Sequence, residues 1–180
     1  MSRSLSDLLN DLDRYVGRVP LDELTARLAG TGVDWEEVRP FVHFDPHGYQ
    51  RNLLHEGPGY QALILCWRAG QRSPIHDHRG SSCGVRVLRG VATETLFARS
   101  AAGLVYATQS REWPAGSVCG SQDADIHQMS NLQDDGEDLV TLHVYSPPLL
   151  HMGVYSLTDG HRWERHEPVF AATFTGGDGI

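Results

Sequence analysis

Apolar positions repeat with two different spacings along the chain, and the change falls near residue 44. The N-terminal stretch carries one apolar stripe at helical spacing, formed by Leu5, Leu8, Leu9, Leu12, Tyr15 and Val16. A second helix is predicted after it, because Pro20 suits a helix start and Gly30 a helix end. Residues 33–42 favour a third short helix. We therefore expect a helical layer over residues 1–43.

From residue 44 onward, short β-branched or aromatic segments alternate with Gly, Pro and Asp. They cover residues 60–70, 83–90, 92–99, 103–110, 110–120 and 137–148. Several short strands at such spacing are typical of a sandwich or barrel. Residues 151–170 favour a final hairpin around Asp159 and Gly160. We predict a mainly β fold: one domain over residues 1–180, in which an antiparallel β-barrel (44–180) carries the N-terminal helices on its surface.

Composition narrows the functional classes. The chain has 180 residues and a formal net charge of −8, which disfavours nucleic acid as a partner. No apolar run is long enough to span a membrane, and the start lacks a secretory signal, so the expected location is the cytoplasm. Three cysteines do not form a disulfide framework. Cys66 is expected in the core, and Cys119 in a loop.

Two histidines stand one residue apart in "PIHDHRGSSCG". In a strand, His76 and His78 would point the same way and Asp77 the opposite way, so the histidines could share one metal ion. The alternative is a pair of surface histidines on a polar strand face. Cys83 follows five positions after His78, where a third ligand is often found.

The surrounding spacing resembles that of cupins. Residues 70–90 read G-x5-H-x-H-x4-C-x6-G, which resembles the first cupin motif with Cys83 in place of a frequent glutamate ligand. His127 and Asn131 resemble the end of the second motif. Three neutral histidines would bind iron, copper, nickel or zinc. Without a carboxylate ligand, the site would keep the full charge of a divalent ion and favour an anionic ligand such as a thiolate.

A third pattern lies in "TLHVYSPP". Thr141, His143 and Tyr145 alternate with Leu142 and Val144, so the polar trio shares one face of a strand. A buried barrel strand normally turns its apolar side chains inward. In this strand, however, either face could be the inner one. The trio could therefore face either the barrel interior or solvent.

Five segments taken together resemble the thiol dioxygenases, above all cysteine dioxygenase. They are "YQRNLL", "YQALILCWRAGQRSPIHDH", "LRGVATETLF", "IHQMSN" and "TLHVYSPP", within about residues 44–152. The resemblance implies that a mononuclear iron(II), Fe(2+), is held by His76, His78 and His127. It further implies the following roles: a thioether between Cys83 and Tyr145, with Trp67 beside it; a Thr141–His143–Tyr145 relay; substrate carboxylate binding by Arg51 near Tyr49; and a pocket lined by Met152.

The activity implied by this resemblance is the addition of both atoms of O2 to the thiol of L-cysteine, giving cysteine sulfinic acid, by a protein expected to be a monomer. Alternatives are the same reaction on 3-mercaptopropionate or cysteamine, a sugar isomerase, and a metal-binding cupin without activity. Arg51 favours a carboxylated thiol. From the residues alone, Arg51 could instead be a solvated surface charge, and Cys83 a small buried strand residue.

Overall fold

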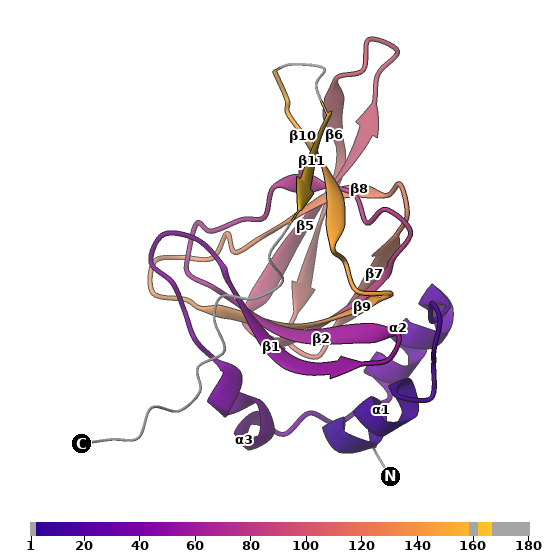
Figure 1. Cartoon of the computed structure of the whole chain (residues 1–180). Helices are drawn as coiled ribbons and strands as arrows, with labels where there is room; N and C mark the ends of the chain where they lie inside the picture. The colour runs from indigo at the N-terminus through magenta and orange to yellow at the C-terminus, as the bar shows by residue number, and fades with distance from the viewer. Residues whose placement is uncertain (1–2, 159–161, 167–180) are drawn as a thin grey trace, which may run out of the picture.

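The structure, a computed structural model that describes residues 3–158 and 162–166, consists of two antiparallel sheets with short helices on one side (Figure 1). The helices are α1 (Leu5–Leu12), α2 (Leu21–Ala29) and α3 (Trp35–Val38), followed by a 3-10 turn, Arg39–Phe41. The strands are β1 (Gln50–Gly57), β2 (Tyr60–Trp67), β3 (Ile75–His76), β4 (Ser82–Arg89), β5 (Val91–Arg99), β6 (Val105–Pro114), β7 (Val118–Gln122), β8 (Ile126–Ser130), β9 (Leu139–Ser146), β10 (His151–Tyr155) and β11 (Arg162–His166).

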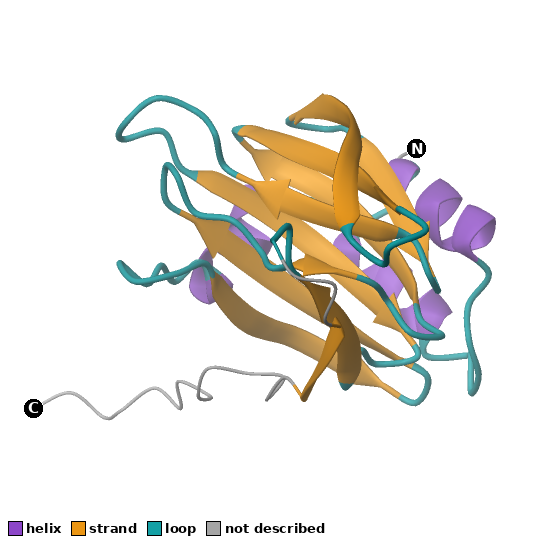
Figure 2. Cartoon of the chain, turned by 90° about the horizontal axis from the view of Figure 1, so that it is seen from above, coloured by secondary structure: helices purple, strands orange, loops and turns teal. Residues whose placement is uncertain are grey.

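The strands form sheets in the orders β1-β2-β9-β4-β7 and β11-β10-β3-β8-β5-β6. Seen from above, the strands run across the molecule and the helices lie behind and beside them (Figure 2). This arrangement confirms the mainly β prediction with N-terminal helices packed on the strands. None of the helices in the described part of the chain is both long and apolar enough to cross a membrane.

Helix α1 is shorter than the apolar stripe predicted. Ser4 caps it with a reciprocal capping box to Asp7, but the helix ends at Leu12, and Val16 beyond it is 85% exposed. After the C-cap Asp13 the chain turns, and the Tyr15 amide donates to the Leu12 carbonyl oxygen at 3.0 Å. The apolar spacing therefore continued past the point at which the helix could continue.

The middle of the five-stranded sheet is buried on both faces, because the helices cover its outer face. Every residue of β2 and β9 is buried. On β9, Leu142 and Val144 pack with the helices in one apolar cluster, so the alternating residues Thr141, His143 and Tyr145 face the barrel interior. The helical layer thus settles which face of "TLHVYSPP" is the inner one.

Strand β4 shows how closely α2 approaches. A Cβ on Gly84 would lie 2.5 Å from a methyl carbon of Leu28, so only glycine fits between strand and helix. The neighbouring residue Cys83 faces the interior. It packs in a second apolar cluster, which lies inside the barrel and includes Leu65 and Trp67. Cys119 lies in β7, buried in that same cluster, so its placement in a loop was wrong: the glycines around it permit a strand that pairs with β4.

The six-stranded sheet presents the histidine segments. Short β3 pairs with β8, where His76 lies opposite His127, and also with β10. Strands β10 and β11 pair as an antiparallel hairpin, as expected, while the turn residues Asp159 and Gly160 lie outside the described residues.

Candidate metal centre

Three histidines meet inside the barrel. His76 ends β3, His78 follows it, and His127 comes from β8; all are at most 6% exposed. One nitrogen from each lies within 4.8 Å of the others, and the ring centroids are 4.8–5.1 Å apart. The alternative of two surface histidines is therefore excluded. The three side chains could hold one metal ion.

The hydrogen bonds of the rings leave nitrogens directed to a shared ligand. His76 Nδ1 lies 3.0 Å from the carbonyl oxygen of Pro74, and His127 Nδ1 lies 2.8 Å from Glu94 Oε1. Carbonyl and carboxylate oxygens accept, so both Nδ1 atoms carry protons and both Nε2 atoms have a free lone pair. Neither ring nitrogen of His78 has a hydrogen-bond partner, although both are buried.

An unpaired buried polar atom is costly, and a metal ion would satisfy it. Burial, together with the charge of His127, lowers the pKa of His76 to about 3. Burial likewise holds the pKa of His78 well below its usual range. Both rings are therefore neutral at pH 7, which is the form that binds metals. The donor set fits a metal ion that accepts imidazole ligands.

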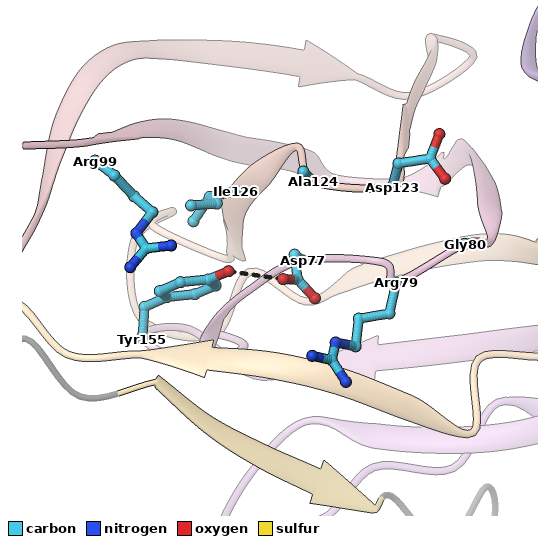
Figure 3. A pocket seen from close by; sticks show the side chains of 8 residues that line it. All are labelled: Asp77, Arg79, Gly80, Arg99, Asp123, Ala124, Ile126 and Tyr155. Atoms are coloured by element: carbon cyan, nitrogen blue, oxygen red, sulfur yellow. Dashed lines mark hydrogen bonds between the residues drawn. The ribbon is translucent and has the colours of Figure 1, made fainter. Parts of the chain in front are cut away.

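Asp77 points away from the histidines, as the alternation predicted. Its carboxylate accepts hydrogen bonds from the Gly153 amide and the Tyr155 hydroxyl, both at 2.7 Å. Figure 3 shows the contact between Asp77 and Tyr155 in the wall of an open pocket of about 490 Å³. Arg99 lies over the Tyr155 ring there. Asp77 thus ties the segment that carries His76 and His78 to β10.

The three histidines line a small cavity together with most of the residues singled out from the sequence. The other lining residues are Tyr49, Arg51, Leu65, Trp67, Ser73, Cys83, Met129, His143, Tyr145 and Met152. Arg51, on β1, is only 8% exposed, and its Cζ lies 5.5 Å from the centre of the Tyr145 ring. The alternative of a solvated surface arginine is therefore excluded. Tyr49 stacks on Trp67 with ring centroids 4.3 Å apart.

A chain of hydrogen bonds runs along the inner face of β9. The indole N–H of Trp67 donates to Thr141 Oγ1 at 3.1 Å; His143 Nε2 lies 3.0 Å from that oxygen, and Nδ1 lies 3.2 Å from Tyr145 Oη. Burial, and then the charge of Arg51, keep the pKa of His143 well below its usual range, so the ring is neutral. If the Thr141 hydroxyl donates to His143 Nε2, the ring proton of His143 lies on Nδ1 and is donated to the phenol oxygen of Tyr145. The phenol proton of Tyr145 can then be donated to a ligand in the cavity.

Cys83 lies beside this chain. It is the direct cross-strand neighbour of Tyr145 in the β4–β9 pairing, and its Sγ lies 4.0 Å from His143 Nδ1. Such neighbours have Cβ atoms about 5 Å apart. Burial raises the pKa of the Cys83 thiol, and among the described residues the group close enough to share one metal ion consists of the three histidines without Cys83. Cys66 faces the helices, and burial raises its pKa to about 12, as expected of a core thiol.

The sequence analysis did not identify the residues that surround the three histidines. The largest omission is Glu94, a buried residue of β5 whose second oxygen accepts from Trp113 Nε1 at 3.0 Å. Burial raises the pKa of Glu94, but the hydrogen bonds from His127 and Trp113 outweigh burial, so the pKa lies below its usual value. An isolated acid within the strand pattern "VATETLF" was the available signal. Leu65, Ser73 and Met129 were also missed as cavity residues.

The fold and the site together define a cupin with a three-histidine metal centre. The family model "Cysteine dioxygenase type I" matches residues 2–158, and the chain belongs to that family. The chain is 32% identical over 168 residues to cysteine dioxygenase type 1 of Homo sapiens, covering 89% of this chain and 82% of the relative. It is 30% identical to the Bos taurus protein of the same name over the same lengths.

A solved structure agrees with the fold. A conserved protein from Klebsiella pneumoniae with a double-stranded β-helix domain superposes with a TM-score of 0.55 at 15% identity, covering 66% of this chain and 88% of that one. At that identity the likeness shows the fold alone. Family membership makes the chain a metal-dependent oxidoreductase of the dioxygenase class, as the sequence resemblance indicated.

Proposed function

We propose that this protein is an iron(II)-dependent cysteine dioxygenase that adds both oxygen atoms of O2 to the thiol of L-cysteine, giving cysteine sulfinic acid. The observation that carries the proposal is one cavity in which three buried histidines, a buried arginine and a hydrogen-bonded tyrosine face the same space. A sugar isomerase or a simple binding cupin gives these groups no common task. The relatives named cysteine dioxygenase type 1 support the same reaction.

His76, His78 and His127 would hold the iron(II). The ion would supply the redox chemistry with O2 and the positive charge that keeps a bound thiol deprotonated. Three protein ligands leave further positions for exogenous groups, and the absence of a carboxylate among them favours an anionic sulfur ligand. The protein's own residues would then choose the substrate and hold it in place.

Arg51 would bind the substrate carboxylate through its planar guanidinium, which matches a carboxylate with two parallel charge-assisted bonds. Tyr145, on the facing side of the same cavity, would donate its phenol proton to the bound substrate. His143 and Thr141 act as positioning residues for that phenol. Tyr49 stacks on Trp67 near Arg51, and Met152 closes the cavity from β10, so both limit the size of the substrate.

Cys83 would form a thioether to the Tyr145 ring. The reaction joins Sγ to a ring carbon next to the hydroxyl, and the S–H and C–H hydrogens leave with two electrons, for which O2 is a sufficient oxidant. The cross-strand pairing of the two residues supports this bond. It would fix the ring in the orientation that the β9 hydrogen-bond chain already favours. We propose that the protein acts as a monomer of one domain in the cytoplasm, where free thiols are abundant.

The runner-up function is the same oxidation of 3-mercaptopropionate, which also has a carboxylate for Arg51. Oxygen uptake by the iron(II)-loaded protein, measured with L-cysteine, 3-mercaptopropionate and cysteamine in parallel, separates the candidates. We expect the highest kcat/KM with L-cysteine and the lowest with cysteamine, which has no carboxylate. A preference for 3-mercaptopropionate would agree with the proposed metal centre and contradict L-cysteine as the substrate. Uptake with cysteamine equal to that with L-cysteine would remove the role of Arg51.

A further inference from the structure

The three histidines of the metal centre differ in what holds their outer ring nitrogen. His76 donates to a neutral backbone carbonyl, and both nitrogens of His78 are without a hydrogen-bond partner. His127 alone, among the described hydrogen bonds of these rings, donates to a charged group, the carboxylate of Glu94 at 2.8 Å. Of the three ligands, His127 is thus the one with a carboxylate directly behind it.

Glu94 is built into the sheet that presents His127. It lies on β5, between β8, which carries His127, and β6, which carries Trp113. One carboxylate oxygen accepts from His127 and the other from the Trp113 indole, and Glu94 is 4% exposed. A buried carboxylate is costly unless it is paired and hydrogen-bonded. Here both oxygens are occupied, so the side chain has one orientation.

The negative charge of Glu94 lies where it can act on the metal centre through His127. Cupins frequently have a glutamate ligand where this chain has Cys83, and Cys83 is not among the described residues that lie close enough to share one metal ion. A carboxylate behind a histidine fixes the ring orientation and raises the basicity of the nitrogen that faces the metal. The carboxylate of Glu94 would therefore both orient His127 and strengthen it as a donor.

We propose that Glu94, held by Trp113, is a positioning residue that returns one negative charge to the metal centre through His127. This inference rests on the proposed metal binding by His76, His78 and His127. It assigns to the β5–β6 hairpin a part in metal affinity and redox tuning, although neither residue faces the substrate cavity. Removing such an outer partner typically lowers metal affinity about 10–100-fold.

The test must separate the charge from the hydrogen bonds. A glutamine at position 94 offers one acceptor oxygen, so its amide NH2 would face the Trp113 donor in a simple Glu94→Gln variant. The Trp113→Phe background removes that donor. Comparing Trp113→Phe with Trp113→Phe/Glu94→Gln keeps the acceptor for His127 and changes only the charge. Glu112→Gln, on the exposed part of β6, is the matched control for loss of an acid.

Iron(II) affinity is measured anaerobically by competition with a coloured chelator, and thermal unfolding is measured for each protein with and without iron(II). We expect the double variant to bind iron(II) about 10–100-fold more weakly than Trp113→Phe. Its metal-free form should be no less stable, and Glu112→Gln should match the wild type. Equal iron(II) affinity of the double variant and Trp113→Phe would overturn the proposal. So would a loss of stability of the same size with and without metal, which would mark Glu94 as a fold residue.

One more variant separates this inference from the function on which it rests. His78→Ala should abolish tight iron(II) binding if the three histidines form the metal centre. If His78→Ala binds iron(II) as well as the wild type, the metal centre itself is wrong. If His78→Ala fails to bind iron(II) while Trp113→Phe and Trp113→Phe/Glu94→Gln bind it with equal affinity, only the role of Glu94 is contradicted.

Discussion

Thr141→Val is the most informative single change, because it removes one buried hydroxyl and keeps the shape of the side chain. That hydroxyl accepts from the Trp67 indole at 3.1 Å and contacts His143 Nε2 at 3.0 Å. Thr141 and Trp67 are fully buried, and His143 is 3% exposed, so water cannot replace the lost partner. Each buried polar group left unsatisfied costs about 1–3 kcal/mol, and two such groups together cost about 2–6 kcal/mol.

The assay is urea unfolding of the metal-free protein, read as the free energy of unfolding at constant m-value. Thr141→Ser is the control, since it keeps the hydroxyl and loses a methyl group, a change of about 1 kcal/mol. We expect the valine variant to be less stable than the serine variant by at least ~1 kcal/mol. Trp67→Phe should reduce the additional cost of Thr141→Val, because one stranded donor is then absent. Equal stability of the valine and serine variants would refute the hydrogen-bond chain.

Three further predictions follow from other parts of the site. Burial and Arg51 lower the pKa of His143 in the folded protein, so His143 stabilises the fold above the unfolded pKa of about 6.5, and this stabilisation is lost as the pH falls. Below that pH the free energy of unfolding of the wild type should therefore fall more steeply than that of His143→Gln, by up to about 1.4 kcal/mol per pH unit in denaturant titrations. Tyr155→Phe removes a donor to the buried carboxylate of Asp77, so it should destabilise by about 1–3 kcal/mol and weaken iron(II) binding, whereas Tyr106→Phe, at a site that is 52% exposed, should do neither. Protein exposed to iron(II), L-cysteine and O2 should contain a fraction lighter by a pair of hydrogen atoms in the intact-mass spectrum, and Cys83→Ser should lack it; a fraction that persists in Cys83→Ser would refute the thioether.

The candidate site was predictable from the sequence where spacing alone sets direction. The H-x-H pair and the alternation of Thr141, His143 and Tyr145 follow the two-residue repeat of a strand. The structure places the H-x-H pair, His143 and Tyr145 in one cavity, with Thr141 hydrogen-bonded to His143 behind it. Which face of β9 is the inner one did not follow from that repeat. The answer came from the helices that cover Leu142 and Val144, a tertiary contact that no local pattern contains.

Other features depended on partners that are distant in the chain. Glu94 lies 33 residues before His127, and only the pairing of β5 with β8 brings them together. Cys119 was expected in a loop, yet it lies in β7, where Gly120 beside it permits the close packing of α2 against the strand. The end of α1 at Leu12 did not follow from the apolar spacing, because that spacing continues to Tyr15 and Val16 while the chain turns after Asp13.

The most direct test of the central claim is the oxygen content of the product formed from L-cysteine in isotopically labelled O2. The iron(II)-loaded protein is supplied with L-cysteine in ordinary water under the labelled gas, and the product is analysed by mass. A dioxygenase built on this cavity predicts cysteine sulfinic acid in which both sulfinate oxygens carry the label. Disulfide as the sole product, or a sulfinate with one labelled oxygen and one from water, would contradict it.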